Sequence, residues 1–285
     1  MIHRNDPPRV AAIHDLSCFG RCALTVVIPI LSAMGAQVIP IPTALLSSHT
    51  GGFDNLHFRD LTEDMRGIIS HFGRLGLRFD AIYSGFLGSL EQIDIVSEFI
   101  DNFGDGIPVL VDPVMGDDGV LYSTYTKEMA AGMGRLCHKA TVITPNITEA
   151  CLLAGVPMPS GPLTEAGAAE LAEGLTRTIR REFGDKEIVI TGIHYDADGR
   201  DMIANACASP GKPLRLVSNP RLPRSFPGTG DIFSSVLLGS MLQNGDLGSA
   251  IEKSTDFTHR VIAASQDSPS PTRDGVLLEK FLMEL

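Results

Sequence analysis

Short apolar runs alternate with helix-like segments along most of this 285-residue chain. The runs are almost continuously apolar, which is typical of parallel strands buried on both faces. The alternation therefore predicts an α/β fold with a central, mostly parallel sheet between helices. The expected strands are residues 9–14, 36–43, 80–85, 107–113, 139–146 and 186–192. The expected helices are residues 22–35, 61–76, 89–104, 126–136, 147–155, 163–184, 231–245 and 247–265.

The pattern changes after Ile193. Residues 194–219 indicate short strands joined by turns around Asp198-Gly199 and Pro210-Gly211, which predicts a small antiparallel edge. No linker rich in Pro, Gly or Ser and no internal repeat divides the chain, so we expect one domain over residues 1–285.

The formal net charge of −11 disfavours nucleic acid and anionic membranes as partners. Residues 22–53 carry no Asp, Glu, Lys or Arg, a length that could span a membrane, but Pro29, Pro40 and Pro42 interrupt the stretch. A buried helix followed by a buried strand is therefore favoured. The polar first ten residues lack a signal-peptide core, and the five cysteines lack metal-ligand spacing, which together favour a reduced, cytoplasmic protein.

Polar residues follow each expected parallel strand. Ligands bind beyond the carboxyl ends of the strands in open sheets of this kind, so six polar strand ends predict a cleft, although any one of them could be ordinary turn chemistry. These residues include His14, Asp15, Ser17, Thr43, Ser47, His49, Thr50, Asp112, Asp117, Asn146, Glu149, Thr191 and Gly192.

The stretch Gly228-Thr229-Gly230-Asp231 stands directly before an expected helix. Glycines allow close approach of the backbone to a ligand, and a helix start adds partial positive charge, so this stretch predicts an anion hole that needs no lysine. Asp231 has two interpretations. It is either the N-cap of the helix, or a general base that takes a proton from a hydroxyl group as that oxygen attacks phosphorus.

Asp112, Asp117 and Glu149 follow strands that we expect to be neighbours. Phosphoryl transfer from ATP needs Mg²⁺, which proteins hold through carboxylates and waters. Asn146 and Glu149 would face one way at a helix start, and Asn146 is also a good N-cap; the two roles can coexist. The chain has no Walker pattern, and no dinucleotide-binding glycine pattern follows the first strand, which disfavours a P-loop enzyme and an NAD-dependent oxidoreductase.

Seven pieces in order carry a family resemblance: "LLSSHTG" at 45–51, "YSGFLGS" at 83–89, "VDPVMGD" at 111–117, "LY" at 121–122, "TPNITEA" at 144–150, "ITG" at 190–192 and "PGTGDIFSS" at 227–235. Together they resemble the ribokinase-like superfamily, and within it the vitamin B6 kinases, over roughly residues 10–264. The resemblance implies a three-layer α/β/α sandwich. It also implies transfer of the ATP γ-phosphate to the 5′-hydroxyl of pyridoxal, pyridoxine or pyridoxamine.

The resemblance also implies residue roles, a Mg²⁺ cofactor and a homodimer, and it leaves open whether a monovalent cation is needed. Asp231 matches the catalytic base, and Gly228, Thr229 and Gly230 match the anion hole. The acidic residues around metal and phosphates match Asp112, Asp117 and Glu149. The nucleotide side matches Tyr122, Asn146, Thr191 and Gly192, and the wall that holds the pyridine ring matches Ser47, His49 and Thr50.

Two departures lie on the substrate side. Asp15 stands five residues before Gly20, where the family usually has serine; its carboxylate could pair with a protonated ring nitrogen or with the amine of pyridoxamine, or it could cap the next turn. Phe86 replaces a usual tyrosine and keeps a ring face without the hydroxyl group.

Two other functions stay open. Hydroxymethylpyrimidine kinases of the same superfamily resemble this chain, but often carry cysteine at the position of Asp231, so Asp231 favours a B6 substrate. A non-catalytic B6-binding protein could share the fold, because fold alone does not define function. Retention of Asp231 and of the metal-side carboxylates argues against it.

Overall fold

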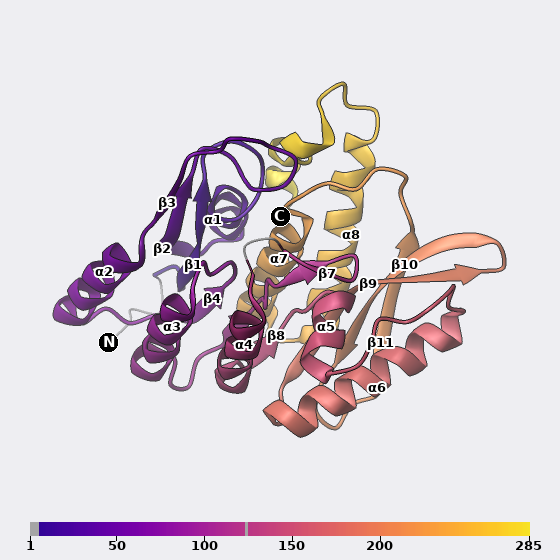
Figure 1. Cartoon of the computed structure of the whole chain (residues 1–285), viewed down its shortest axis with the longest axis horizontal. Helices are drawn as coiled ribbons and strands as arrows, with labels where there is room; N and C mark the ends of the chain where they lie inside the picture. The colour runs from indigo at the N-terminus through magenta and orange to yellow at the C-terminus, as the bar shows by residue number, and fades with distance from the viewer. Residues whose placement is uncertain (1–5, 123–124) are drawn as a thin grey trace.

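The computed structural model describes residues 6–122 and 125–285, so the first half of the polar N-terminal stretch lies outside it. Nine strands form one sheet in the order β11-β10-β9-β8-β5-β4-β1-β2-β3 (Figure 1). Its strands are β1 (Arg9–Ser17), β2 (Gln37–Leu46), β3 (Phe58–Asp60), β4 (Ala81–Ser84), β5 (Val109–Val111), β8 (Val142–Ile143), β9 (Glu187–Ala197), β10 (Arg200–Ala208) and β11 (Arg215–Pro220). A separate two-stranded hairpin joins β6 (Gly116–Asp117) to β7 (Val120–Leu121).

The six inner strands from β9 to β2 pair in parallel, as the alternation predicts. β10 and β11 add the expected antiparallel edge after β9. β3 pairs antiparallel with β2 and closes the other edge, which we did not expect from the sequence. The hairpin β6–β7 was likewise not expected.

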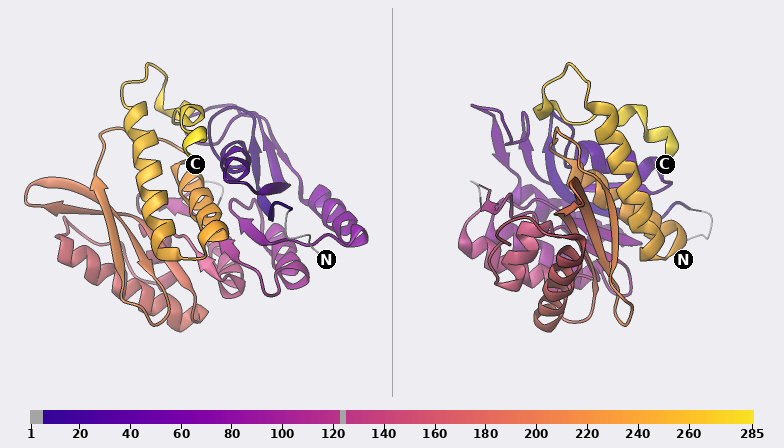
Figure 2. Two further views of the ribbon diagram at one scale, coloured as in Figure 1. Left: turned by 180° about the vertical axis from the view of Figure 1, so that it is seen from behind. Right: turned by 90° about the vertical axis from the view of Figure 1, so that its right-hand side faces the viewer.

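Helices cover both faces of the sheet, so the molecule has the three-layer α/β/α architecture that the resemblance implies. Neighbouring strand residues alternate between the two layers: Ala11 and Ile13 pack with α2 to α6, and Val10 and Ala12 pack with α1, α7 and α8. Figure 2 shows α1, α7 and α8 together on the second face. The helices are α1 (Leu24–Ala33), α2 (Thr62–Leu75), α3 (Leu90–Phe103), α4 (Lys127–Lys139), α5 (Ile147–Ala154), α6 (Glu165–Phe183), α7 (Thr229–Asn244) and α8 (Leu247–Ser265).

The uncharged stretch is a buried helix followed by a strand, α1 and β2, as expected. Within the described ranges, no helix combines the length and the apolar character that crossing a membrane requires. Two alternatives for single residues are wrong. Asp15 lies inside β1, which continues to Ser17, so it does not cap a turn. Helix α7 begins at Thr229 with Gly228 at its N-cap, so Asp231 is not the N-cap.

Candidate active site

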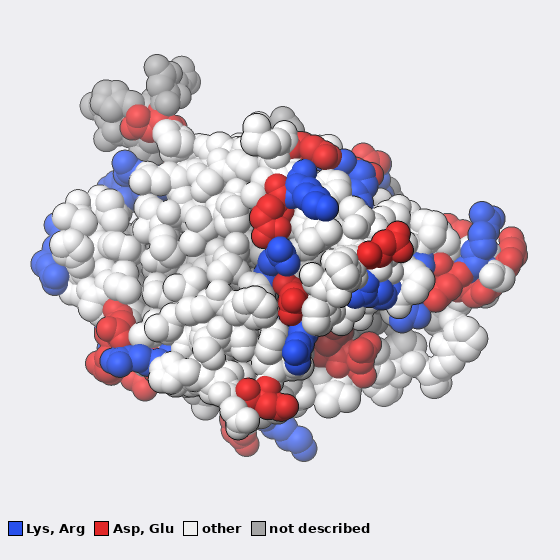
Figure 3. All heavy atoms as spheres, turned by 90° about the horizontal axis from the view of Figure 1, so that it is seen from above, with Lys and Arg blue, Asp and Glu red and all other residues white. Residues whose placement is uncertain are grey.

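The carboxyl ends of the six parallel strands lie at one edge of the sheet, at the top of the molecule in Figure 1. Seen from that side, the molecule has Lys and Arg interspersed with Asp and Glu, and a broad area left of centre is nearly free of charge (Figure 3). The side chains predicted for the site come from these strand ends and from the start of α7. The sheet topology therefore brings the predicted residues to one edge.

Asp231 lies in the first turn of α7, with 18% of its side chain exposed. Its Oδ2 accepts a hydrogen bond of 2.8 Å from the backbone N–H of Ala23, the N-cap residue of α1. Its Oδ1 lies 3.9 Å from Nδ1 of His14, a buried ring whose pKa burial lowers to about 3, so that it is neutral. Burial raises the pKa of Asp231 to about 7, and the charge of Asp15 adds to this rise. A carboxylate with this pKa can accept a proton at neutral pH.

The start of α7 has free amide groups. The N–H of Ile232 is the first to bond back within the helix, to the carbonyl oxygen of Gly228 at 3.1 Å. The amides of Thr229, Gly230 and Asp231 precede it and have no acceptor within the helix. We call residues 18–23, between β1 and α1, the first loop. Gly228 has φ +78° and lies against this loop, since a Cβ there would be 2.0 Å from the carbonyl oxygen of Arg21. A Cβ on Gly230 would meet nothing within 4 Å, so the space beside it is open to a ligand.

Asp112 and Glu149 form a second acidic group next to Asp231. Asp112 follows β5, and its Oδ2 accepts a hydrogen bond of 3.3 Å from Ser234 on α7. Burial raises the pKa of Asp112 well above its usual range, and the charges of Glu149 and Asp231 raise it further. Burial also raises the pKa of Glu149, to about 8. The charge of Glu149 thus acts on Asp112, and among the described ion pairs no Lys or Arg compensates either carboxylate.

This acidic group fits a divalent cation bound mainly by phosphates and waters. No cluster of three or more His, Cys, Asp or Glu side chains among the described residues is arranged to hold a metal by itself. Both oxygens of Glu149 already accept backbone N–H groups, from Met115 at 2.9 Å and from Asn146 at 2.8 Å. Mg²⁺ usually keeps several waters and takes only one or two carboxylates, so a bound metal would suit Asp112 directly and Glu149 through water.

Asn146 caps α5, as expected. Its Oδ1 accepts from the N–H of Glu149 at 2.9 Å, which completes a reciprocal capping box, and its Nδ2 donates to the carbonyl oxygen of Gly116 at 2.8 Å. This second bond ties the β6–β7 hairpin, which carries the exposed Asp117, to the start of α5. Although the residue is exposed to solvent, the surrounding protein partly desolvates the Asp117 carboxyl group, which raises its pKa.

The remaining residues predicted for the nucleotide side lie near this hairpin and on β9. Tyr122, 40% exposed, directly follows β7. Thr191 and Gly192 belong to β9, and Thr191 forms a bridge with Asn146. Gly192 has φ +75°, and its N–H donates to Oδ1 of Asn205 at 3.2 Å.

Asp15 is buried at the end of β1, and the hydroxyl group of Ser17 donates to its Oδ2 at 2.8 Å. Burial raises the pKa of Asp15. The same carboxylate raises the pKa of Asp231, which indicates that the two groups lie close enough to interact.

The residues predicted to hold a pyridine ring follow β2 and β4. We call residues 47–57, between β2 and β3, the wall loop. Ser47 and Thr50 are exposed, and His49 is buried. Both ring nitrogens of His49 have protein partners: Nδ1 accepts from the N–H of Gly51, and Nε2 lies 2.6 Å from the carbonyl oxygen of Arg273. Phe86 follows β4 and is half-buried.

Sequence reasoning did not foresee the contacts of Ala23 and Arg273. Both bring together segments far apart in the chain, and neither residue belongs to a motif. The backbone of Ala23 has φ +49°, which is uncommon for a residue with a Cβ and directs its N–H to Asp231. The positive φ of Ala23 cannot be read from the local residue types.

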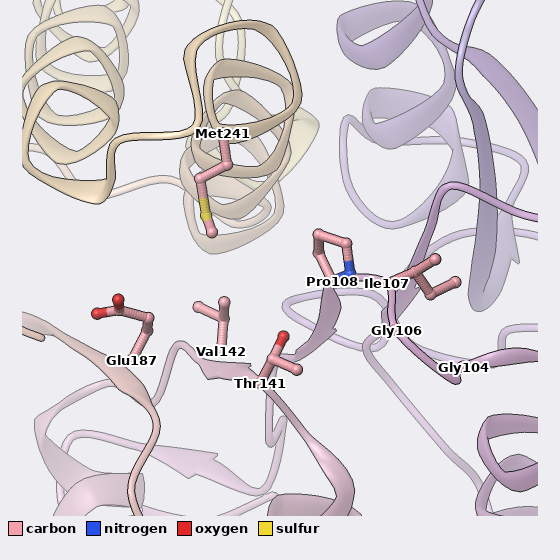
Figure 4. Close-up of a pocket in the computed structure, with 8 residues that line it drawn as sticks. All are labelled: Gly104, Gly106, Ile107, Pro108, Thr141, Val142, Glu187 and Met241. Atoms are coloured by element: carbon pink, nitrogen blue, oxygen red, sulfur yellow. The ribbon is translucent and has the colours of Figure 1, made fainter. Parts of the chain in front are cut away.

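A separate hollow of about 340 Å³ lies at the opposite edge of the sheet, at the amino ends of β5, β8 and β9 (Figure 4). Met241 of α7 faces Val142 and Pro108 across it. None of the residues predicted for catalysis lines this hollow, so it is not the site described above.

The sheet order and the helix layers define a ribokinase-like α/β fold. A crystal structure of pyridoxal kinase from Lactobacillus plantarum has this fold, with a TM-score of 0.85 and 28% identity, covering 97% of this chain and 96% of that one. The match to the phosphomethylpyrimidine kinase family spans residues 28–271, and the chain belongs to this family.

Two further relatives bear on the substrate. One is a candidate phosphomethylpyrimidine kinase from Bacteroides thetaiotaomicron, crystallised in a form with pyridoxal. It is 40% identical to this chain, with a TM-score of 0.88, and the match covers 98% of this chain and 96% of that one. The pyridoxine/pyridoxal/pyridoxamine kinase of Bordetella avium is 28% identical over 93% of this chain and 90% of its own length.

Proposed function

We propose that this protein transfers the γ-phosphoryl group of ATP to the 5′-hydroxyl of a vitamin B6 vitamer: pyridoxal, pyridoxine or pyridoxamine. One observation carries the proposal. A partly accessible aspartate with a pKa near 7 lies in the first turn of a helix whose leading amides are free. A base and an anion-binding group are thus adjacent, as phosphoryl transfer to a hydroxyl group requires.

In the proposed mechanism Asp231 is the general base. Ala23 occupies Oδ2, so Oδ1 is the atom available to take the proton of the substrate hydroxyl group. The substrate oxygen then bonds to the γ-phosphorus as the bond from that phosphorus to the ADP oxygen breaks. The amides of Thr229, Gly230 and Asp231 stabilise the negative charge on the transferring group.

Mg²⁺ would neutralise phosphate charge when bound, and Asp112, Asp117 and Glu149 are the residues that we propose to hold it, partly through water. Asn146, Tyr122, Thr191 and Gly192 lie on the side that we propose for the nucleotide. Asp15, Ser47, His49, Thr50 and Phe86 lie on the side that we propose for the vitamer. We also propose that the protein is a homodimer, which the family resemblance supports. We propose a cytoplasmic location as well, which the five free cysteines support.

Hydroxymethylpyrimidine is the alternative acceptor: the family is named for the kinase of a phosphorylated methylpyrimidine, and a hydroxymethylpyrimidine/phosphomethylpyrimidine kinase is among the relatives. Two observations support a B6 acceptor instead: Asp231 stands where pyrimidine kinases often have cysteine, and the Bacteroides structure at 40% identity contains pyridoxal. A non-catalytic binding protein is less well supported, because it would need neither the base nor the acidic group.

The test is ATP turnover with Mg²⁺ on pyridoxal, pyridoxine, pyridoxamine and hydroxymethylpyrimidine, with Asp231→Asn as the control. We expect turnover on B6 vitamers that falls by about 10²–10⁴-fold in the variant. Turnover on hydroxymethylpyrimidine alone would keep the mechanism and change the substrate. Binding of pyridoxal without any turnover would favour the non-catalytic alternative.

A further inference from the structure

The wall loop is closed at its neck but lacks strand pairing along its length. Ser47 and His57 exchange two hydrogen bonds there: the N–H of Ser47 donates to the carbonyl oxygen of His57 at 3.0 Å, and the N–H of His57 donates to Oγ of Ser47 at 2.9 Å. Gly51 and Gly52 lie between these residues, and glycines leave the backbone many conformations. The conformation of the loop therefore depends on contacts from outside it.

Arg273 supplies these contacts from residues 266–275, which we call the C-terminal segment. Its guanidinium group lies 4.8 Å from the centre of the Phe53 ring, and its Nη1 donates to the carbonyl oxygen of Gly52 at 3.0 Å. Its backbone carbonyl oxygen lies 2.6 Å from Nε2 of His49. One residue thus contacts the wall loop at three points.

The contact to His49 defines the state of its ring. A carbonyl oxygen only accepts, so Nε2 carries the hydrogen, and Nδ1 accepts from the N–H of Gly51 at 3.1 Å. The ring packs edge-on against Phe53, with centroids 5.0 Å apart. On its other side it contacts the first loop, where a Cβ on Gly20 would be 2.4 Å from the ring. Protein groups occupy both ring nitrogens, so His49 serves the site through its shape.

The C-terminal segment is itself fixed to two further loops, which are the first loop and the loop that precedes Gly228. Arg21 of the first loop donates to the carbonyl oxygen of Asp274 at 3.2 Å, and it also pairs at 2.7 Å with Glu279, which lies just beyond the segment. Arg224, just before the anion hole, donates to backbone carbonyl oxygens of this part of the chain, those of Gln266 at 2.5 Å and Ser268 at 3.0 Å among them. The segment therefore links the wall loop to the loops that carry Ala23 and Gly228.

We propose that Arg273 is a positioning residue for the acceptor substrate: it holds the wall loop in the shape that receives the acceptor ring. This rests on the proposed function, in which the wall loop contacts the vitamer. Arg273 does not act at the reacting atoms, and its contacts lie away from the residues proposed for the nucleotide. Its loss should therefore weaken acceptor binding and leave nucleotide binding unchanged.

The kinetic test compares Arg273→Ala with Arg66→Ala, an exposed arginine on α2 that pairs with Glu91. We expect the KM for pyridoxal to rise about tenfold in Arg273→Ala, with the KM for ATP and the Tm unchanged, and no effect in the control. Arg273→Lys should recover part of the loss, because it keeps a cation near Phe53. An unchanged KM for pyridoxal, or a parallel rise in both KM values, would overturn the proposal.

A second test needs no substrate. Hydrogen–deuterium exchange of residues 48–56 should be faster in Arg273→Ala than in the wild type, with the β9–β10 hairpin unchanged. Gly275→Ala should have the same effect while it keeps the arginine, because Gly275 has φ +83° and a Cβ there would lie 2.8 Å from Cβ of Arg21. Equal exchange in all three proteins would refute the anchoring role. If the wild type phosphorylates none of the acceptors, the proposed function fails, and the exchange measurement still decides the role of Arg273.

Discussion

Individual carboxylates define the electrostatics of this site. Burial raises the pKa of Asp15, Asp112 and Asp231, and no Lys or Arg forms an ion pair with any of them among the described residues. Each of them therefore destabilises the folded protein once it ionises. Functional sites often keep such a cost because a perturbed carboxylate is what the chemistry needs.

Asp231→Asn should change how the stability of the folded protein depends on pH. The pKa of Asp231 is about 7 in the folded protein and about 3.9 in an unfolded chain, so the folded state binds the proton more strongly. Wild-type stability should therefore fall as pH rises from about 4 to 7, and this fall should be smaller in the variant. Urea unfolding at several pH values measures it, with the exposed Asp105→Asn as a control. Parallel pH profiles for wild type and Asp231→Asn would contradict the raised pKa.

The same pKa predicts the pH dependence of turnover. Only ionised Asp231 can accept the substrate proton, so kcat/KM should rise with pH through about 7 and level off above it. Initial rates at saturating ATP give the profile. A rate that is flat between about pH 6 and 8 would exclude Asp231 as the base.

Asp15→Ser should change vitamer preference. A buried carboxylate favours a cationic group, so the variant should lose more kcat/KM with pyridoxamine than with pyridoxal, and its KM for ATP should stay the same. Ser17→Ala is the matched control, because it removes the hydrogen bond of 2.8 Å and keeps the carboxylate. An equal loss with all vitamers would assign Asp15 a structural role.

At the scale of elements, two glycines at the start of α7 look alike in the sequence but differ in the space around them. Gly228→Ala must place a Cβ 2.0 Å from a backbone oxygen at a left-handed φ, so it should lower the free energy of unfolding by about 2 kcal/mol or more. Gly230→Ala meets no protein atom. It should keep the Tm and lose turnover, because its methyl group enters the proposed phosphate space. Thermal melts and rates of the two variants test this contrast, and a large loss of stability in Gly230→Ala would contradict it.

The same scale shows how far the sequence predicts the structure. Short, nearly continuous apolar runs predicted every inner strand, and the Asn146 cap followed from its residue type and spacing. β3, β6 and β7 were missed because each has only two or three residues and lies outside the predicted apolar runs, whereas the equally short β5 and β8 lie inside the runs 107–113 and 139–146. Asp231 was predicted from its motif, and its role stays a prediction, whereas the contacts of Ala23 and Arg273 are tertiary and leave no local pattern.

For the whole molecule, the proposed sites use residues that lie on or follow strands across the parallel part of the sheet, from β2 to β9. Ligand binding should therefore raise the Tm of the entire fold. A non-hydrolysable ATP analogue at about 100 times its Kd should add about 2.7 kcal/mol to the free energy of unfolding. Asp112→Asn should remove the Mg²⁺-dependent part of this shift and leave the shift with pyridoxal alone unchanged. Thermal melts with and without Mg²⁺ test this, and a Mg²⁺ effect that survives in the variant would exclude Asp112 as a metal ligand.

The anchor of the wall loop also sets an order of events during protein synthesis. The loop and Arg273 are more than 200 residues apart, so the ribosome adds the arginine long after the loop and after every strand of the described sheet. A nascent chain therefore contains every strand of the described sheet before Arg273 is present to hold the wall loop. A chain terminated shortly before Arg273 would carry Asp231 and the start of α7 but would lack the contacts that anchor the wall loop. Under the proposed function, such a chain should bind the acceptor more weakly than the 285-residue chain.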